Sequence, residues 1–353
     1  MNRISRSKLQ LLLFALIISS CVYEDEMHDP SPESLFRAYT STIGVDEIIN
    51  PSSNYISVIG DIQEYISPYD LGTDSYHYFL NTMAWIYVQN KVYNNIKCVL
   101  QDGDITWGNM YSQWCRYQVG ASFIEETLPF LICTGNHDYD WSISNDGRWI
   151  IEDRRSSMFN SFFPGKAVES HITDRFEDDV LDNYIAKFVI GENTINILVL
   201  EFAPRTEAVD WACNIVSTHS NERYILMTHE MLDKNGFVYR NSSSEYHFKG
   251  ISSTYSTPKD IWDKLVYPNN NVICTLCGHN DYFNHVKLEN AYGRKVSNIL
   301  FNLQYQPNGG DGKIMLWEFP LNKDVMKVSI YNTVTRSIES EKMEEFEIDL
   351  NYL

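Results

Sequence analysis

Side chains that could bind divalent cations recur at five places along the chain, each where a short apolar run gives way to a glycine or a polar loop. The five groups are Asp61 with Gln63, Asp104, Asn136 with His137, His229, and His279 with Asp281. Two-metal hydrolase sites need such a set of oxygen and imidazole donors, including one carboxylate that bridges two cations roughly 3.5–4 Å apart. Each group alone has a structural explanation, such as a helix cap or a histidine satisfied in a loop, but all five in order favour one shared site.

The elements that must position these groups are short strands separated by helices. Apolar or β-forming runs at 55–59, 96–100, 130–133, 224–227 and 272–276 predict strands that end directly before the five groups. The sequence also predicts helices at 75–93 and 208–217, a β-hairpin at 184–190 and 194–201, and strands at 313–319, 325–331 and 345–350. Strands that alternate with helices imply parallel pairing, with functional groups at the carboxyl ends of the strands.

The order of these motifs resembles the calcineurin-like metallophosphoesterases, whose pattern is Asp-x-His, Gly-Asp-x-x, Gly-Asn-His-Asp/Glu, an isolated His and Gly-His-x-His. The matching segments are Asp61-Ile62-Gln63, Gly103-Asp104-Ile105-Thr106, Gly135-Asn136-His137-Asp138, Thr228-His229-Glu230 and Gly278-His279-Asn280-Asp281. The resemblance covers about residues 55–320. It implies an α/β fold, a four-layer α-β-β-α sandwich of two mixed β-sheets flanked by helices, in one domain over residues 50–353. It also implies metal-dependent hydrolysis of a phosphate monoester or diester.

The resemblance further implies a role for each matching residue. Asp104 would bridge the two cations. One cation would be completed by Asn136, His229 and His279, and the other by Asp61, Gln63 and Asp281. The cofactors would be one or two divalent ions, Mn, Fe, Zn or Mg. His137 would protonate or stabilise the leaving oxygen, oriented by Asp138. Arg205 would bind the substrate phosphate, although an arginine after a proline at a strand end is more often structural.

Several positions depart from the family pattern. Gln63 stands in place of the histidine of the first motif and Asp281 in place of the last histidine, so one cation loses both imidazoles. The site of that cation should favour Mn, Mg or Ca, or bind its cation weakly. The alternative is an enzyme with a single cation. His285 is a further candidate for the place of Asp281, although its position fits an ordinary strand or loop histidine. Trp107 replaces the tyrosine that ligates iron in purple acid phosphatases, which disfavours that subfamily.

The first twenty residues predict a signal peptide. Three basic residues precede an apolar run over 9–18 that is too short to span a bilayer. The run ends at Cys21 in a sequence that resembles a bacterial lipobox, so we expect this cysteine to be lipidated; an ordinary secretory signal is the alternative. Residues 21–49 would be an acidic, flexible tether, with the folded domain beginning near residue 50.

These features predict a lipoprotein of the outer membrane in the bacterial cell envelope. The Asp-x-Gln first motif is similar to that of a secreted bacterial branch of the family. Acidic residues at 24–26 resemble an export signal for the cell surface, and a merely solvated linker explains them equally well. No transmembrane helix is expected after the leader.

The amino-acid composition limits the classes of molecule that the protein is expected to bind. The chain of 353 residues is 44% hydrophobic and has 28 Lys and Arg against 47 Asp and Glu, for a net charge of −19. Residues 1–20 carry three positive charges and no negative ones, so their removal would take this to −22. Nucleic acid is not an expected partner because it needs clustered cations. A small phosphate ester is the expected substrate. The alternative is a catalytically degenerate surface lipoprotein that binds a glycan or a phosphorylated ligand.

The cysteines do not predict a second metal site. Cys274 and Cys277 form a lone Cys-x-x-Cys with no second pair at zinc-ribbon spacing. In a strand their thiols would point to opposite faces. Buried free thiols are therefore favoured over a redox or zinc role.

Overall fold

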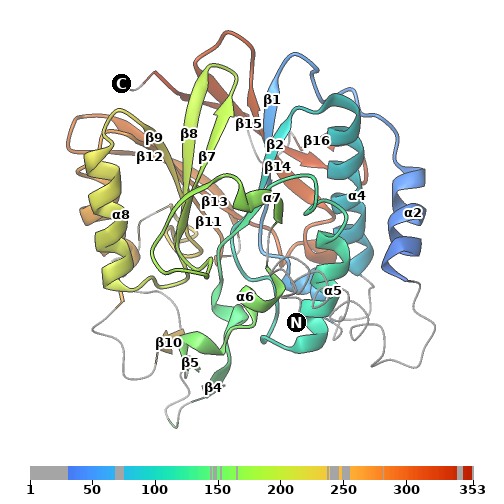
Figure 1. Ribbon diagram of the computed structural model, residues 1–353, viewed down its shortest axis with the longest axis horizontal. Coiled ribbons are helices and arrows are strands. Elements are labelled where there is room, and N and C mark those ends of the chain that lie inside the picture. Colours follow the sequence, from blue (N-terminus) through green and yellow to red (C-terminus); the bar gives the residue numbers. More distant parts are fainter. Residues whose placement is uncertain are drawn as a thin grey trace, which may run out of the picture.

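Two mixed β-sheets form the centre of the molecule. The computed structural model describes residues 31–67, 75–143, 145, 149–151, 153–163, 166–236, 238, 246–248, 255–280, 282–339 and 345–351. Within them, two seven-stranded sheets pack face to face and helices cover both outer faces (Figure 1). The predicted four-layer α/β sandwich of two mixed sheets is confirmed.

The first sheet has the strand order β16-β15-β14-β1-β2-β3, and β17 pairs with β15. Its strands are β1 (Asn54–Ile59), β2 (Ile96–Gln101), β3 (Phe130–Ile132), β14 (Lys313–Phe319), β15 (Val325–Asn332), β16 (Ser337–Ile338) and β17 (Phe346–Asp349). β1 pairs with β2 and β2 with β3 in parallel, while β14 is antiparallel to β1. The carboxyl ends of β1, β2 and β3 therefore meet at one edge of this sheet.

The second sheet has the order β12-β13-β11-β9-β8-β7-β6. Its strands are β6 (Ile172–Arg175), β7 (Tyr184–Ile190), β8 (Asn193–Val199), β9 (Arg223–Met227), β11 (Val272–Cys277), β12 (Tyr282–Glu289) and β13 (Lys295–Asn302). The central strands β8, β9, β11 and β13 are parallel, and antiparallel strands flank them. The predicted hairpin is confirmed as β7 and β8.

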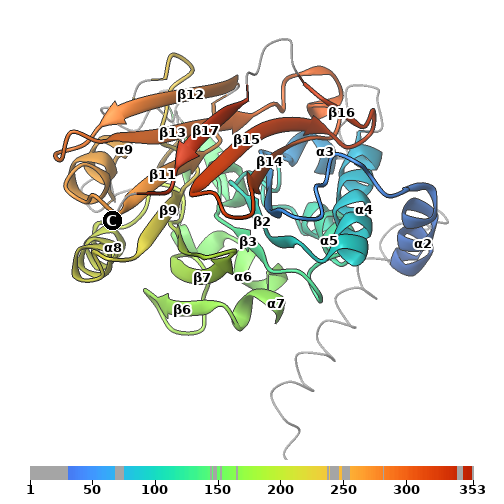
Figure 2. The same cartoon turned by 90° about the horizontal axis from the view of Figure 1, so that it is seen from above.

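The longer helices lie outside the two sheets. The longer ones are α2 (Pro32–Thr42), α4 (Tyr76–Tyr93), α5 (Tyr111–Ala121) and α8 (Thr206–Thr218), and the short ones are α3 (Gln63–Ile66), α6 (Phe159–Phe162), α7 (Lys166–Glu169) and α9 (Pro258–Ile261). Helices α4 and α5 lie outside the first sheet and α8 outside the second (Figure 1). Viewed from above, α2 lies on the outer side of α4 (Figure 2).

The central strands are buried on both faces. In β8, Ile197 and Val199 join the core between the two sheets, while Leu198 packs with Val209 of α8. Successive side chains of a strand point to opposite faces, so a strand between two apolar layers needs an unbroken apolar run. This explains why the predicted strands lack the polar alternation of a half-exposed sheet.

A small three-stranded sheet extends from the site described below. It consists of β4 (Trp141–Ile143), β5 (Trp149–Ile151) and β10 (Tyr246–Phe248), and it lies at the lower edge of the view in Figure 1. A separate apolar cluster supports it, in which Trp141 packs against Tyr139, Ile151 and Phe202. Neither this sheet nor the antiparallel pair β12 and β13 was predicted.

The predicted tether is wrong for residues 31–49. Helix α2 begins at Pro32, with Ser31 as its N-cap, and its Phe36 ring contacts Tyr87 and Phe123 edge to face. Apolar residues inside a polar stretch therefore make a packed helix where the acidic composition suggested a spacer. Residues 1–30, which include the predicted signal peptide and Cys21, lie outside the described residues.

A buried carboxylate attaches the segment after α2 to the domain. Asp46 accepts hydrogen bonds from the Trp85 indole N–H at 3.1 Å and from the Tyr331 hydroxyl, and its own N–H donates to Gln89 Oε1 at 2.8 Å. Asp46 is 9% exposed. The folded domain thus begins well before residue 50.

The cysteine prediction is confirmed for four buried residues. Cys98, Cys133, Cys274 and Cys277 are buried free thiols, and burial raises the pKa of each. Cys274 lies in the core between the sheets and Cys277 in the core beneath α8, on opposite faces of β11. Over the part of the chain that the structure describes, no helix has the length and apolar character needed to cross a membrane.

We predict that Asp46→Ala lowers the free energy of unfolding by about 2–4 kcal/mol, because it leaves two buried donors without an acceptor. Urea denaturation of the domain measures this. The adjacent exposed Glu47→Ala is the matched control and should change stability by less than about 0.5 kcal/mol. Equal stability of the two variants would contradict the assignment of residues 31–49 to the domain.

Candidate metal centre

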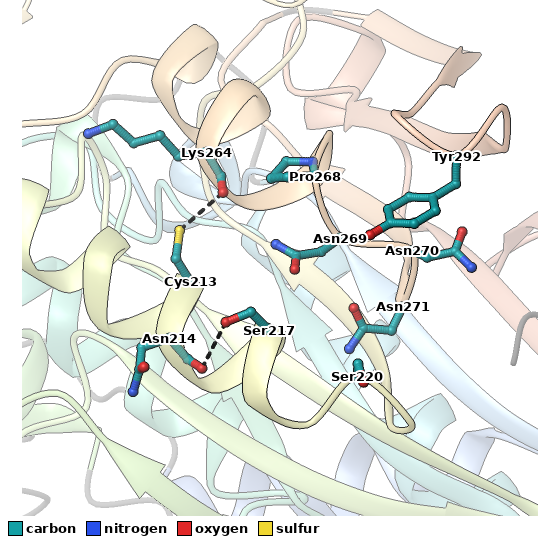
Figure 3. Close-up of a pocket in the computed structure, with 10 residues that line it drawn as sticks. All are labelled: Cys213, Asn214, Ser217, Ser220, Lys264, Pro268, Asn269, Asn270, Asn271 and Tyr292. Carbon is teal, nitrogen blue, oxygen red and sulfur yellow. Dashed lines mark hydrogen bonds between the residues drawn. The ribbon is translucent and has the colours of Figure 1, made fainter.

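A surface hollow of about 640 Å³ lies away from the predicted residues. It is lined by Cys213, Lys264, Asn271, Tyr292 and neighbouring residues of α8 and the loop before β11 (Figure 3). This places it at the amino ends of β9 and β11. Burial raises the pKa of the Cys213 thiol to about 11, so it is not a ready nucleophile.

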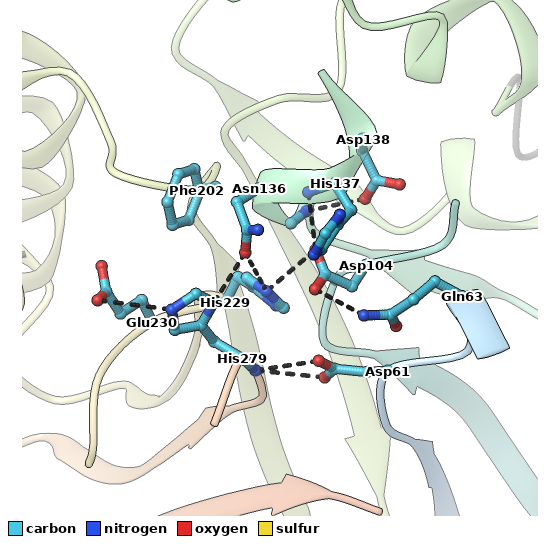
Figure 4. Close-up of polar contacts among 12 residues, drawn as sticks. Asp61, Gln63, Asp104, Asn136, His137, Asp138, Phe202, His229, Glu230 and His279 are labelled. Atoms are coloured by element: carbon cyan, nitrogen blue, oxygen red, sulfur yellow. Dashed lines mark hydrogen bonds and ion pairs between the residues drawn. The ribbon is translucent and has the colours of Figure 1, made fainter. Parts of the chain in front are cut away.

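The predicted residues meet at the opposite end, where the parallel strands of both sheets terminate. Asp61 follows β1, Asp104 follows β2, Asn136 and His137 begin the single turn η1 (Asn136–Asp138) after β3, His229 follows β9 and His279 follows β11. Their side chains converge in Figure 4. Asp281 lies outside the described residues.

Four donor atoms form a compact group. His229 Nε2 lies 3.2 Å from both Asp104 Oδ1 and Asn136 Oδ1, and His279 Nδ1 lies 2.7 Å from Asn136 Oδ1. Asp104, His229 and His279 offer ligand atoms that all lie within 4.8 Å of one another. Ligands of a single tetrahedral ion, at about 2.0–2.2 Å from it, lie about 3.3 Å apart, so this spacing fits one cation.

A backbone carbonyl holds the His229 imidazole in place, and side chains contact the His279 imidazole. His229 Nδ1 lies 2.8 Å from the carbonyl oxygen of Asp102, so its Nδ1–H donates there and its Nε2 faces the cluster. A second partner that fixes a ligating histidine in this way is typical of metal sites. His279 lies at φ 68°, and its Nε2 is 3.9 Å from the buried carboxylate of Glu230.

The turn after β3 approaches Asp104 too closely for a side chain. A Cβ atom at Gly135 would lie 2.1 Å from Asp104 Oδ1. His137, two residues after Gly135, donates its backbone N–H to the same oxygen at 3.0 Å. The glycine of Gly-Asn-His-Asp is therefore required by the packing of one motif against another.

The His137 ring is oriented by Trp107. His137 Nδ1 lies 3.0 Å from the Trp107 carbonyl oxygen, and the two rings meet edge to face with centroids 4.4 Å apart. The Nδ1–H therefore donates to Trp107, which makes Nε2 the nitrogen that can take up a proton. Burial lowers the pKa of His137, and the nearby Asp104 carboxylate opposes that shift.

Asp138 does not orient this ring, contrary to the prediction. Its carboxylate accepts hydrogen bonds from the backbone N–H groups of Ile105, Thr106 and Gly135 at 2.8–3.2 Å, and from the Thr106 hydroxyl at 3.1 Å. Asp138 therefore positions two loops of the site through their backbone N–H groups.

The opposite side of Asp104 is occupied by Gln63. Gln63 is completely buried, and its Nε2 donates to Asp104 Oδ2 at 3.0 Å. Asp61 accepts from Asn302 Nδ2 at 2.6 Å and from the His279 backbone N–H at 3.2 Å. His285 does not replace Asp281 here, because its ring stacks on Phe346 with centroids 3.6 Å apart.

Asp102 is a residue of the site that we did not predict. It is completely buried, and neither carboxylate oxygen has a hydrogen-bond partner in the described structure. A Cβ atom at Gly278 would lie 2.1 Å from Asp61 Oδ1 and 3.0 Å from Asp102 Oδ1, so the two carboxylates share one small space. The available signal was an aspartate two residues before Asp104, at the end of an apolar strand.

The charges of the cluster fit a bound cation. Burial raises the pKa of Asp61 and of Asp102 well above the usual range, and the Asp104 carboxylate raises both further, while His229 opposes the shift. Burial alone would also raise the pKa of Asp104, but His229 and the other imidazoles hold it well below its usual range. Burial opposes the charged form of His229, yet Asp104 and Asp61 raise its pKa to about 10. A proton on His229 Nε2 thus partly neutralises the negative charge of these carboxylates, as a bound cation would.

Arg205 differs from its predicted role as a phosphate ligand. Its guanidinium forms ion pairs with Glu177 at 2.6 Å and Glu201 at 2.9 Å, and it packs over the Phe176 ring. Arg154 pairs with the other oxygen of Glu201 at 3.1 Å. The charge of Arg205 is therefore neutralised within this ion-pair network.

Comparison with known proteins agrees with this geometry. The family model described as "Calcineurin-like phosphoesterase" matches residues 55–282. The chain belongs to the calcineurin-like phosphoesterase family. This is a family of metal-dependent phosphoric ester hydrolases.

The individual relatives are either distant in sequence or similar over a short segment only. "Uncharacterized protein YvnB" of Bacillus subtilis (strain 168) is 26% identical over 301 residues, which are 81% of this chain and 20% of that protein. "Probable inactive purple acid phosphatase 27" of Arabidopsis thaliana is 42% identical over 48 residues, 13% of this chain and 8% of that protein. This chain thus spans about a fifth of the length of YvnB.

A solved structure supports the fold. Purple acid phosphatase PPD1 from yellow lupin (Lupinus luteus) seeds superimposes with a TM-score of 0.50 and 15% identity, over 84% of this chain and 54% of that one. The Trp107 indole N–H donates to Glu64 Oε1 at 2.9 Å.

We predict that a cation binding to the metal-free protein at pH 7 releases about one proton, because His229 must lose its Nε2 proton to become a ligand. Since the pKa of His229 is about 10, affinity should rise about tenfold per pH unit between pH 7 and 9. Calorimetric titrations in two buffers of different ionisation enthalpy measure the release. The exposed His219→Ala should leave it unchanged, and identical heats in both buffers would contradict the prediction.

Proposed function

We propose that this protein hydrolyses a small phosphate ester with the help of a bound divalent cation. The observation that carries the proposal is the convergence of Asp104, Asn136, His229 and His279 at the strand ends, where neighbouring donor atoms lie 2.7–3.2 Å apart. Mn, Fe, Zn and Mg are the candidate ions, and the imidazole and amide donors suit the transition metals best.

The residues present fit such an ion, since buried carboxylates crowd the site and neither the Asn136 amide nitrogen nor the two Asp102 oxygens have a hydrogen-bond partner among the described residues. Bound there, the cation supplies a Lewis acid that activates water and neutralises phosphate oxygens. Asp104 and Asn136 provide the oxygen ligands and His229 and His279 the nitrogen ligands. No serine or cysteine nucleophile is required.

His137 is proposed to deliver the proton to the leaving oxygen. Its Nδ1–H is held by the Trp107 carbonyl, so Nε2 is the atom that exchanges the proton. Burial keeps the pKa of His137 below its usual value, so the ring is neutral at pH 7 until it takes up the proton to be delivered.

The proposed location is the bacterial outer membrane, with the domain tethered through a lipid on Cys21. The basis is the leader over residues 1–20 and the lipobox-like sequence before Cys21. Acyl chains on a cysteine anchor a protein without a transmembrane helix. The net charge of −19 disfavours nucleic acid as a partner without excluding a small phosphate ester.

One observation favours the alternative, a surface protein that binds a glycan or a phosphorylated ligand without hydrolysing it. On the small sheet that follows η1, the Trp141 and Trp149 rings contact each other edge to face, with their centroids 4.0 Å apart. Both residues are half-buried. Exposed indole faces suit sugar rings. His137 in its hydrogen bond to Trp107 argues for catalysis, because a pure binding site has no need of a proton donor.

We predict that His137→Ala lowers kcat for nitrophenyl phosphate esters about 10²–10⁴-fold while bound metal is unchanged, because the side chain transfers a proton and is not a ligand. Asp104→Ala should lose both metal and activity. Hydrolysis assays with metal analysis of each purified variant measure the two effects, and the exposed His77→Ala is the control. Bound metal without turnover in the wild type would favour the binding protein.

We predict that Cys21→Ala moves the protein from the membrane fraction to the soluble fraction of expressing cells, because the acyl chains are its anchor. Detergent phase partition and incorporation of labelled palmitate measure this. Cys213→Ala is the matched cysteine control and should stay in the membrane fraction. Membrane association that survives Cys21→Ala would contradict the anchor.

A further inference from the structure

The role of His137 fixes where the leaving group of the substrate lies. In the proposed function His137 delivers a proton to the leaving oxygen, so that oxygen must come within hydrogen-bond reach of Nε2. The backbone N–H of His137 donates to Asp104 Oδ1 at 3.0 Å, next to the metal ligands, and its ring meets the Trp107 indole with centroids 4.4 Å apart. The group that departs with the oxygen therefore lies within reach of the Trp107 indole.

The Trp107 side chain is held in one position. Its backbone carbonyl accepts the Nδ1–H of His137 at 3.0 Å, and its indole N–H donates to Glu64 Oε1 at 2.9 Å. The residue is half-buried, so part of the ring faces solvent. An aromatic ring that is fixed before binding loses little conformational entropy when a ligand packs on it. The exposed part of the indole is thus a preorganised contact surface.

The apolar surface continues beyond Trp107. A Cβ atom at Gly108 would lie 3.9 Å from the Trp141 indole nitrogen and 4.0 Å from the terminal methyl carbon of Met110. Met110 is 43% exposed, and Trp141 is half-buried against Trp149. Three partly exposed apolar side chains therefore lie around one glycine. We call Trp107, Met110 and Trp141 the apolar wall.

The chemistry of the apolar wall favours an uncharged aromatic ring. Indole rings pack on such rings stacked or edge to face, and methionine sulfur makes favourable contacts with them. The hydroxyl groups of a sugar would lose water against the Trp107 ring and the Met110 side chain without gaining a hydrogen bond from either surface. The Glu64 carboxylate at the edge of the indole repels anionic groups.

We propose that the apolar wall binds the leaving group, and that the substrate is a phosphate ester of an alcohol or phenol that carries an uncharged aromatic ring. The inference rests on the proposed function and names its substrate class. Trp107 then has two separate tasks, since its backbone carbonyl orients His137 and its indole selects the leaving group.

Hydrolysis of three phosphate monoesters tests the selection. Benzyl phosphate carries an aromatic ring, hexyl phosphate a flexible apolar chain and glucose 6-phosphate a sugar ring, and each releases a primary alcohol. We expect the full-length protein with Mn²⁺ to show a kcat/KM for benzyl phosphate about three- to tenfold higher than for either of the other esters.

The variant Trp107→Leu tests the residue. The readout is the ratio of kcat/KM for benzyl phosphate to that for hexyl phosphate within each variant, because a change in proton delivery affects both esters and cancels. The ratio should fall to about one in Trp107→Leu and stay above one in Trp107→Phe, which keeps an aromatic ring. Trp211→Leu is the matched control, because Trp211 is also half-buried and its indole N–H also donates to a carboxylate, that of Asp174 at 3.3 Å. It should keep the wild-type ratio.

Binding of phosphonates separates this inference from the proposed function. Benzylphosphonate and hexylphosphonate have a C–P bond in place of the ester bond, so calorimetric titration gives their Kd whether or not the protein is an enzyme. We expect benzylphosphonate to bind about three- to tenfold more tightly than hexylphosphonate, and Trp107→Leu to remove the difference.

The outcomes divide the two proposals. Turnover and binding without a preference for the benzyl compounds, or a preference for glucose 6-phosphate, would overturn the aromatic substrate class and leave hydrolysis intact. A preference that survives Trp107→Leu would overturn the role of the indole. No turnover of any ester, with tighter binding of benzylphosphonate that Trp107→Leu removes, would overturn the hydrolase proposal and support the aromatic site. Neither turnover nor a binding preference would overturn both.

Discussion

The structure depends on the burial of several carboxylates in one place. Asp61, Asp102 and Asp104 end two adjacent strands and are almost completely removed from water. Charged oxygens are stable inside a protein only when cations, protons or N–H donors neutralise them. In the folded protein, the imidazolium of His229 and the amides of Gln63 and Asn302 partly neutralise these carboxylates. A divalent cation neutralises them more completely. Metal binding follows from this arrangement of charge.

The positions of these groups come from the topology. Parallel pairing of β1, β2 and β3 in one sheet, and of β8, β9 and β11 in the other, sends all their carboxyl ends to the same end of the sandwich. Loops that leave parallel strands there must pass close to one another. Gly135 and Gly278 lie at two such crossings, where a Cβ atom would strike Asp104 or Asp61 at 2.1 Å.

Much of the site could be predicted because its residue types stand at the ends of apolar runs. The order of Asp61, Asp104, Asn136, His229 and His279 was enough to expect one cluster. The partners of these residues could not be predicted. Trp107 orients His137 through its backbone carbonyl, which any residue type provides, so no side chain in the sequence marks that role. The role of Asp138 could not be predicted either, because its carboxylate accepts hydrogen bonds from backbone N–H groups, which nearly every residue type provides. Arg205 is occupied by Glu177, and no local pattern indicates that pairing.

The sequence by itself determined the fold class, the family and the metal-binding character of the strand ends, because these depend on residue types in a fixed order. It did not determine which contacts the buried polar groups make, since those depend on distances between segments far apart in the chain. Only the tertiary structure decided that residues 31–49 pack against α4, that Asp102 lies beside Asp61, and that Gln63 donates to Asp104. The physical reason is that a buried polar atom takes its chemical role from the neighbours that replace water around it.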